Sequence, residues 1–192
     1  NGSKVYSVGG NFRTNFLKKL LKINSGIKQF DSIYTLNEKS KKVIESIGNK
    51  NTIICGDLRF DANIPKLTKK VSDNISKFID NKTCIVFGST WREDEDIILR
   101  YIKNSDRKIK YIIAPHEISN NPKRIEKNLG DESILYSDIK LKTNLQEFSC
   151  LIIDNIGMLS ALYNYSSISY VGGGMGKKGL HNTLEPAYFS KP

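Results

Sequence analysis

The chain has 192 residues, 39% of them hydrophobic, which suffices for one large domain or for one domain and part of another. No run reaches the roughly 20 apolar residues that cross a bilayer, and no segment is ordered like a secretory signal peptide. It has 30 Lys and Arg residues and 20 Asp and Glu residues, so its net charge is +10. A positive charge favours an anionic partner, but it does not distinguish nucleic acid from lipid or from a phosphorylated substrate. We expect a location in the cytoplasm or on a membrane's cytoplasmic face.

Apolar runs alternate with amphipathic or polar segments along the chain, which predicts an α/β fold with a mainly parallel sheet. The expected strands are residues 32–36, 52–55, 84–88, 110–114, 150–153 and 167–171. The expected helices are residues 12–23, 38–47, 65–79, 93–103, 122–129 and 158–163, with a last one beginning near Glu185.

A domain boundary is expected near residues 61–65, between a strand and a lysine-rich helix. It divides the chain into residues 1–62 and 63–192. The last expected helix begins only a few residues before Pro192. We therefore expect a fragment that contains the tail of one α/β domain and most of a second.

Cysteine and histidine are sparse. Cys55, Cys84 and Cys150 are odd in number, far apart and next to apolar strand-like sequence, so we expect them to be reduced core residues. With only His116 and His181, and no Cys-x-x-Cys, the sequence disfavours a structural zinc site.

Near the end of the chain, an apolar strand runs into a glycine-rich segment, residues 172–176, and then into a polar turn. Glycine has no Cβ, so its backbone can approach a ligand closely and can adopt a positive φ. Pro186 suits the first turn of a helix, which would place Glu185 at the cap. A carboxylate there could bind a ribose diol, and free helix N–H groups could hold phosphate. The segment indicates half of a nucleotide-sugar site.

The stretch Gly88-Ser-Thr-Trp-Arg-Glu-Asp-Glu95 lies between an apolar strand and an amphipathic helix. One interpretation is a capping box, with Thr90 as the N-cap residue and Glu93 three residues later. The other is an anion site at the carboxyl end of a parallel strand, where the hydroxyls of Ser89 and Thr90 join free helix N–H groups. The two interpretations are compatible.

His116 ends another expected strand, in the stretch Ile112-Ile-Ala-Pro-His-Glu117. One interpretation is a structural histidine with satisfied hydrogen bonds. The other is a ligand contact, because the carboxyl end of a strand would place the ring on the same sheet edge, where it could bond a base or a phosphate.

The turn Asp154-Asn-Ile-Gly-Met158 repeats the strand, turn and helix pattern. Asp154 or Asn155 could cap the helix that follows. Alternatively, the N–H groups of Gly157 and Met158 could face the same cleft as Ser89. Together with the glycine-rich segment, these turns make a ligand cleft more probable than any one of them alone.

The stretch Gly56-Asp-Leu-Arg-Phe-Asp61 lies at the expected boundary. Arg59 could form an ion pair with Asp57 or Asp61 and stabilise a linker. It could instead contact an anionic ligand across a cleft between domains.

Lysines gather in two places. Lys18, Lys19 and Lys22 lie on the first expected helix, either as a solvated face or as a basic surface for an anionic bilayer. Lys177 and Lys178 lie in the same glycine loop, between Gly176 and Gly179, and are better placed for a phosphate or carboxylate.

Several stretches, taken together and in order, resemble the 3-deoxy-D-manno-octulosonic acid (Kdo) transferases, which attach Kdo to lipid A precursors. The matching stretches are Gly56-Asp-Leu-Arg-Phe-Asp61, Gly88-Ser-Thr-Trp91 with the acidic run to Asp96, Ile113-Ala-Pro-His-Glu117, Gly157-Met-Leu-Ser-Ala-Leu-Tyr163, and Tyr170-Val-Gly-Gly-Gly174 leading to His181-Asn-Thr-Leu-Glu-Pro186. An ordered set of this kind is far more specific than a single glycine motif.

The resemblance implies two Rossmann-like domains in the GT-B arrangement. Residues 1–62 would be the end of the acceptor and membrane-binding domain, and residues 63–192 the donor domain. The implied donor is CMP-Kdo, the acceptor is a lipid A precursor, and no metal or other cofactor is required. The first domain would attach peripherally to the anionic inner membrane of a bacterium, on its cytoplasmic face.

The resemblance also implies a donor site. It places Ser89 and Thr90 near the phosphate, Pro115 and His116 near the nucleotide, Ile156, Gly157 and Met158 as backbone contacts, Gly173 and Gly174 in the glycine-rich segment, and Asn182 and Glu185 at phosphate and ribose. Trp91 would be a wall of the site, and Arg59, Lys177 and Lys178 are further candidates. Family members carry the catalytic glutamate early in the first domain, so this chain is expected to bind donor without transferring sugar.

Other functions share some of these features. Another GT-B transferase or a sugar-nucleotide epimerase would share the glycine-rich segment and the glutamate. A basic nucleic-acid-binding module would explain the charge, but the aromatic residues do not alternate with Lys and Arg along one surface, so nucleic acid is not an expected partner. A purely structural α/β domain is the third alternative.

Overall fold

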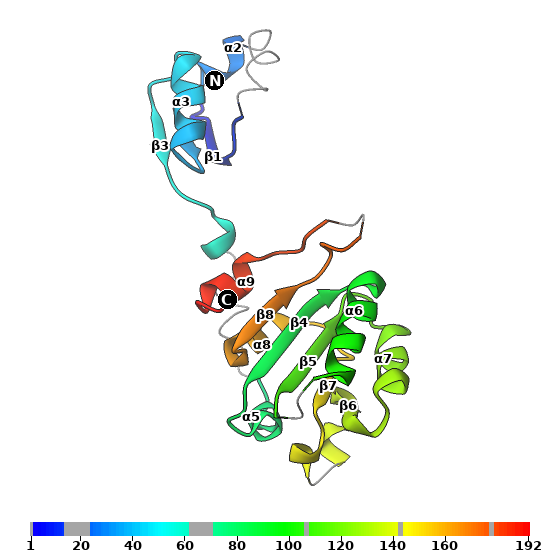
Figure 1. The fold of residues 1–192 in the computed structure, drawn as a ribbon. Coiled ribbons are helices and arrows are strands. Elements are labelled where there is room, and N and C mark those ends of the chain that lie inside the picture. Colours follow the sequence, from blue (N-terminus) through cyan, green and yellow to red (C-terminus); the bar gives the residue numbers. More distant parts are fainter. Residues whose placement is uncertain (1, 14–23, 62–70, 106–107, 142–143, 177–178) are drawn as a thin grey trace. The chain divides into compact units, whose positions relative to one another are not determined.

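The computed structural model describes residues 2–13, 24–61, 71–105, 108–141, 144–176 and 179–192 (Figure 1). The chain divides into two compact units, Asn1–Ala62 and Asn63–Pro192. This division lies at the boundary that the sequence suggested. Every strand pair in either sheet is parallel, so the predicted α/β class is confirmed.

The first unit contains a sheet with the strand order β1-β2-β3. The strands are β1 (Tyr6–Gly10), β2 (Ser32–Thr35) and β3 (Thr52–Ile54), and the helices are α2 (Asn24–Ile27) and α3 (Glu38–Ser46). Asn37 caps α3 by accepting the N–H of Ser40 at 2.9 Å. Val43 and Ile44 then face the sheet and are buried with Ile33.

The second unit contains a sheet with the strand order β6-β7-β5-β4-β8. The strands are β4 (Cys84–Thr90), β5 (Lys110–Pro115), β6 (Ser133–Leu135), β7 (Cys150–Ile152) and β8 (Ile168–Val171). The α-helices are α5 (Asp73–Ile79), α6 (Arg92–Lys103), α7 (Asn121–Leu129), α8 (Leu159–Leu162) and α9 (Leu184–Tyr188). The 3-10 helices are η1 (Gly130–Glu132), η2 (Tyr136–Leu141), η3 (Leu145–Glu147) and η4 (Tyr163–Tyr165).

The core of the second unit has two layers because side chains alternate across each strand. On β4, Val86 joins a cluster with residues of α5 and α8, whereas Phe87 joins a cluster with residues of α6 and α7. Neighbouring strands repeat this alternation, as Ile112 and Ile113 of β5 show. Helices thus cover both faces, which explains why these strands read as continuous apolar runs.

The strand order places a topological switch point beside β4. The chain continues from β4 to β5 on one side, whereas β8 lies against the other side of β4. Loops that leave two such strands turn toward opposite faces, and open α/β sheets bind ligands in the crevice between them. The residues after Thr90 and after Val171 therefore flank the place where a ligand is expected (Figure 1).

The predicted strands and most predicted helices are confirmed, with small shifts of their ends. Strands β1 and β6 were not predicted: Tyr6–Gly10 ends in two glycines, and Ser133–Leu135 contains only two apolar residues. Strand β4 runs to Thr90, two residues past its expected end. The helix expected at 12–23 lies almost entirely outside the described residues, as do Lys18, Lys19 and Lys22. Of the helix expected at 65–79, residues 71–79 are described, and α5 begins at Asp73.

The cysteines are free thiols, as predicted. Cys84 and Cys150 are buried, but Cys55 is only half-buried, so it is not a core residue. Among the described residues, none of the helices combines the length and apolarity needed to span a membrane.

Candidate functional site

Strand β4 ends in an irregular turn at Ser89 and Thr90. Its pairing with β5 slips between Gly88 and Thr90, and Ser89 has a φ of +52°. Such a conformation costs a non-glycine residue on the order of 1 kcal/mol and is typical of ligand sites. Thr90 is fully buried, and its hydroxyl donates to Oε1 of Glu95 at 3.2 Å. The predicted role of the Thr90 hydroxyl in an anion cradle is therefore wrong, since that group bonds to an internal carboxylate.

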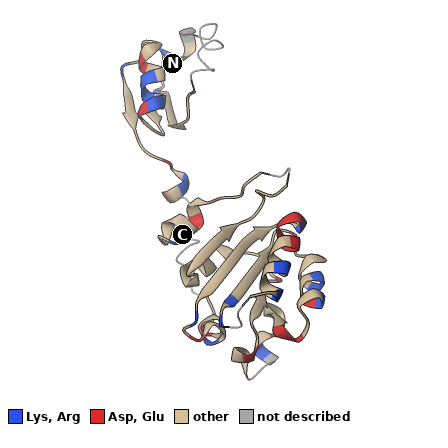
Figure 2. Cartoon of the chain, viewed as in Figure 1, with Lys and Arg blue, Asp and Glu red and all other residues tan. Residues whose placement is uncertain are grey.

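The predicted capping box is also displaced by one residue. Helix α6 has Trp91 as its N-cap residue, because Thr90 still belongs to β4. The backbone N–H of Trp91 donates to Oδ2 of Asp94 at 2.9 Å, so Asp94 takes the place predicted for Glu93. Figure 2 shows acidic residues at the first turn of α6 and basic residues at its last turn, an arrangement that the helix dipole favours.

The glycine-rich segment packs directly against this turn. A Cβ on Gly172 would lie 2.3 Å from the carbonyl oxygen of Ser89, so only glycine fits there. Gly173 has a φ of +94°, which glycine adopts without strain. Its N–H donates to Oδ2 of Asp94 at 2.9 Å. Gly174, in contrast, is exposed, and a Cβ there would make only an ordinary contact with Leu180.

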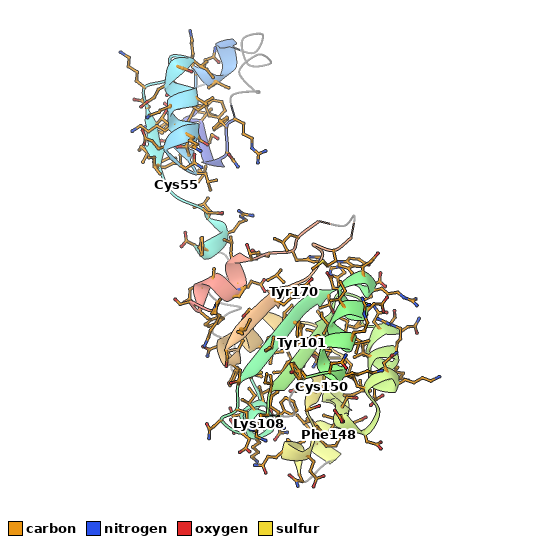
Figure 3. All side chains as sticks on the ribbon, in the orientation of Figure 1. Cys55, Tyr101, Lys108, Phe148, Cys150 and Tyr170 are labelled. Atoms are coloured by element: carbon orange, nitrogen blue, oxygen red, sulfur yellow. The ribbon has the colours of Figure 1, made fainter. Side chains whose placement is uncertain are left out.

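Asp94 joins three segments of the site although only 1% of it is exposed. Besides the two N–H groups, it accepts the hydroxyl of Tyr170 at 2.7 Å, and Figure 3 labels this residue near the end of β8. Burial raises the pKa of Asp94, but bonds from Trp91, Gly173, Tyr170 and the Met175 backbone outweigh it and lower the pKa below its ordinary value. Asp94 is therefore ionised at neutral pH.

Three rings gather at the same sheet edge. Trp91 stacks on His116 with ring centroids 4.4 Å apart, and His116 stacks on His181 at 4.6 Å. The indole Nε1–H of Trp91 donates to Nε2 of His181 at 2.7 Å. The rings come from the turn after β4, the end of β5 and the segment after β8, so the predicted convergence of β4, β5 and the glycine-rich segment is what the structure shows.

The pKa of His181 is lowered, first by burial and then by the neighbouring His116, with Asp94 acting weakly in the opposite direction. The hydrogen bond from Trp91 requires Nε2 of His181 to be an acceptor, which agrees with a neutral ring. At neutral pH the ring of His181 is uncharged, and the three stacked rings offer a flat, polarisable surface that suits a base.

Helix α9 differs from its prediction at the cap. Pro186 lies in the first turn as expected, but the N-cap residue is Thr183, and Glu185 lies within that turn. Asn182 Oδ1 accepts the N–H of Leu184 at 3.1 Å, while Asn182 Nδ2 donates to Glu185 Oε1 at 3.4 Å. The predicted placement of Glu185 at the cap is wrong, because the amide of Asn182 satisfies the helix N–H. The two predicted ligand residues are instead hydrogen-bonded to each other.

The turn before α8 is open. Ile156 is 83% exposed, and Gly157 has a φ of +93° with open space around it. Met158, not Asp154 or Asn155, is the N-cap residue, so the predicted cap is wrong. Asp154 instead accepts the N–H of Ser137 at 3.1 Å, which ties the turn to η2.

Helix α8 reaches the end of β4. A Cβ on Gly88 would lie 2.8 Å from Leu159 Cδ1 and 2.0 Å from the hydroxyl of Tyr163. Pro115 of β5 is buried and is the register partner of Thr90 on the other side. The segments that carry the predicted residues of β4, β5 and α8 thus meet around Gly88 and Thr90.

The remaining candidates lie elsewhere. In the first unit, Arg59 forms the first of its two expected ion pairs, with Asp57 at 2.6 Å. Both residues line a cavity of about 380 Å³ whose other walls are Val8, Gly9, Asn11, Leu36 and Leu58. The hydrogen bonds from Arg59 lower the pKa of Asp57. Lys177 and Lys178 lie outside the described residues.

Sequence reasoning missed Asp94 and His181 as site residues. Asp94 appeared only as part of an acidic run, and its position in the first turn of a helix after a strand was the one available clue. His181 lies in a matched stretch, yet nothing local indicates that Trp91 would be its partner. Among the described residues, no cluster of three or more His, Cys, Asp or Glu side chains is arranged to hold a metal ion.

Comparison with known proteins identifies relatives. No protein-family model matches the chain. It is 32% identical over 171 residues to a 3-deoxy-D-manno-octulosonic acid transferase of Rickettsia bellii, covering 85% of this chain and 40% of the relative. It is 30% identical over 168 residues to the corresponding transferase of Aquifex aeolicus, covering 86% of this chain and 43% of the relative. The chain thus spans less than half the length of these curated relatives.

Among the solved structures that resemble the chain is the C-terminal CMP-Kdo binding domain of WaaA from Acinetobacter baumannii, with a TM-score of 0.52 and 23% identity, covering 70% of this chain and 69% of that one. This likeness confirms the predicted fold, a parallel sheet flanked by helices as in a GT-B domain. In sequence, the chain is similar to 3-deoxy-D-manno-octulosonic acid transferases over about 85% of its own length.

Proposed function

We propose that residues 63–192 form the donor-binding part of a Kdo transferase and hold the CMP group of CMP-Kdo. The observation that carries this proposal is the meeting of Trp91, His116 and His181 beside a glycine-rich segment at the switch point of the sheet. The rings offer a surface for the base, while Gly172 lets the glycine-rich segment pack against the backbone of Ser89 and Thr90, where a Cβ would clash. The CMP-Kdo binding of the similar Acinetobacter domain supports the same assignment.

The predicted contacts divide into two groups in this proposal. His116 and Pro115 would lie near the nucleotide, with Trp91 as a wall. Backbone at Ser89 would lie near the phosphate and backbone at 156–158 near the nucleotide, while Asn182 and Glu185, already paired with each other, would reach phosphate and ribose.

The parent protein would transfer Kdo from CMP-Kdo to a lipid A precursor in lipopolysaccharide biosynthesis. The catalytic base is not among the residues assigned to this chain, and the proposal includes no metal or other cofactor. The net charge of +10 supports peripheral contact with the anionic inner membrane of a bacterium, on its cytoplasmic face. Flotation with anionic but not with zwitterionic vesicles is the expected result, and equal flotation with both would contradict membrane contact through charge.

Thermal unfolding of this chain with CMP, UMP and AMP tests the proposal. A ligand at about 100 times its dissociation constant adds about 2.7 kcal/mol to the free energy of unfolding. We expect the midpoint to rise with CMP and to rise less with UMP or AMP. Equal rises with all three nucleotides, or no rise with CMP, would contradict a CMP site.

Glu185→Ala is the companion variant. It removes a carboxylate assigned to the ribose, so CMP should stabilise it less than it stabilises the original chain. Glu38→Ala is the matched control, because Glu38 also lies in the first turn of a helix but in the first unit. The control variant should keep the full CMP effect.

A further inference from the structure

We infer that Asp94 is the positioning residue of the ligand site, and that its carboxylate holds the glycine-rich segment in its binding conformation. This role rests on the proposed function for the identity of the ligand, but the contacts that support it are independent of any ligand. No direct contact with the ligand is assigned to Asp94, and it acts through the groups that it binds: the N–H groups of Trp91 and Gly173 and the hydroxyl of Tyr170.

The first argument is the distribution of its hydrogen bonds. Oδ2 accepts N–H groups from Trp91 and Gly173, and Oδ1 accepts the hydroxyl of Tyr170. An aspartate in the first helical turn that served only as a cap would bond the N-cap N–H alone. Here the same carboxylate also binds two residues from β8 and the segment that follows it.

The second argument is that the start of α6 binds the chain after β8 at two places. Asp94 binds it at Gly173, and the indole of Trp91 binds it at His181. The N–H of His181 also donates to the carbonyl of Gly172 at 3.1 Å, next to the first of these bonds. The side chains of Met175 and Leu180 are 56% and 62% exposed, so they contribute little packing.

The third argument is electrostatic. Asp94 is buried yet ionised, because the bonds it accepts outweigh the cost of burial. Bonds to a charged acceptor are about twice as strong as bonds between neutral groups. A variant that removes the charge of Asp94 but keeps the shape of its side chain should therefore weaken the hydrogen bond to Gly173 without unfolding the second unit.

The experiment measures amide hydrogen exchange at Gly173 and CMP affinity by calorimetry in three variants of this chain. Asp94→Asn keeps the size of the side chain and removes its charge. Tyr170→Phe removes one donor and keeps the ring, which packs against Phe87 at 5.9 Å between centroids. Asp73→Asn is the matched control, an exposed aspartate in the first turn of α5.

In Asp94→Asn we expect the Gly173 amide to exchange about tenfold faster and CMP affinity to fall by about the same factor. The reason is that a hydrogen bond to a charged acceptor is stronger than one to a neutral acceptor by about the free energy that corresponds to a factor of ten. Exchange at Val86 in the core of β4 should stay unchanged. Tyr170→Phe should change both quantities in the same direction by less, and Asp73→Asn should change neither.

Unchanged exchange at Gly173 in Asp94→Asn would overturn the inference, and so would faster exchange with unchanged CMP affinity. If Asp94→Asn fails to fold, the same two criteria apply to Tyr170→Phe. A wild-type chain with no preference for CMP would contradict the proposed function instead. The exchange measurement needs no ligand, so it still decides whether Asp94 holds the segment.

Discussion

The indole of Trp91 donates a hydrogen bond to Nε2 of His181 across 2.7 Å, although the two residues lie 90 positions apart in the chain. This bond joins the start of α6 to the segment that follows β8. Since Nε2 is the acceptor, the neutral ring must carry its proton on Nδ1. The protonation state of His181 is therefore coupled to the hydrogen bond that joins the start of α6 to the segment after β8.

Acid should break this contact. The pKa of His181 is lowered below the ordinary value of 6.5, so its contribution to stability is present above that value and is lost as pH falls through the folded pKa. His116 and Asp94 are the other titratable groups acting on the ring. Trp91 is the only tryptophan, so its fluorescence should change in one step below pH 6.5. His181→Gln should abolish that step, and its persistence would contradict the assignment.

His116→Gln provides a second test of the ring cluster. His116 lowers the pKa of His181, so its removal should raise that pKa toward the ordinary value. The fluorescence step of Trp91 should move to higher pH, the opposite of its loss in His181→Gln. A step at the original pH would show that His116 does not lower the pKa of His181.

Gly172→Ala should destabilise the second unit. The added Cβ would lie 2.3 Å from the carbonyl oxygen of Ser89 and 2.7 Å from Cα of Thr90, and backbone cannot move aside cheaply. Overpacking of this kind costs about 1–3 kcal/mol, measurable by urea unfolding. Gly174→Ala is the control, because its Cβ would meet Leu180 only at 3.8 Å, and its effect should stay within about 0.5 kcal/mol.

Arg124→Gln should lower the free energy of unfolding by more than any surface substitution does. Glu95 is fully buried on α6 and pairs with Arg124 on α7, so the change leaves a buried carboxylate without its cation. Breaking a buried pair in this way costs about 3–5 kcal/mol. Asp96→Asn, which removes the exposed partner at 3.2 Å, should cost less than about 1 kcal/mol.

The cost of Arg124→Gln should also depend on pH. Burial already raises the pKa of Glu95 above its ordinary value of 4.5, and Arg124 opposes that rise. Without Arg124 the pKa rises further, so the loss of stability is small below 4.5 and grows as pH increases. Urea unfolding of variant and original chain at pH 5 and pH 8 measures this, and an equal loss at both values would contradict it.

Local sequence was enough to predict the parallel α/β fold and the segments of the site. Continuous apolar runs such as Cys84–Thr90 can form strands covered on both faces, and turn residues bound them. The glycines at 172, 173, 174 and 176 were predicted for close approach to a ligand; at 172 and 173 the structure shows that glycine is needed for close approach to the chain's own backbone. These inferences hold because periodicity and backbone freedom are properties of neighbouring residues.

The caps were predicted less well. Thr90 and Glu185 are plausible capping residues, and each lies one or two positions from the true cap. A polar side chain can hydrogen-bond to any suitable group within reach, including groups distant in sequence. Thr90 bonds to the buried Glu95. Local patterns identify the turn but do not decide which of several polar residues completes it.

The composition of the site itself follows from the order of the strands. Pairing of β4 with β8 brings the N–H of Gly173 to Asp94, 79 residues away, and brings His181 to Trp91. Periodicity in the sequence carries no information about contacts across that distance. Sequence alone therefore established the kinds of residues at the sheet edge, whereas tertiary structure decided which of them bond, because hydrogen bonds depend on positions that only strand pairing and register determine.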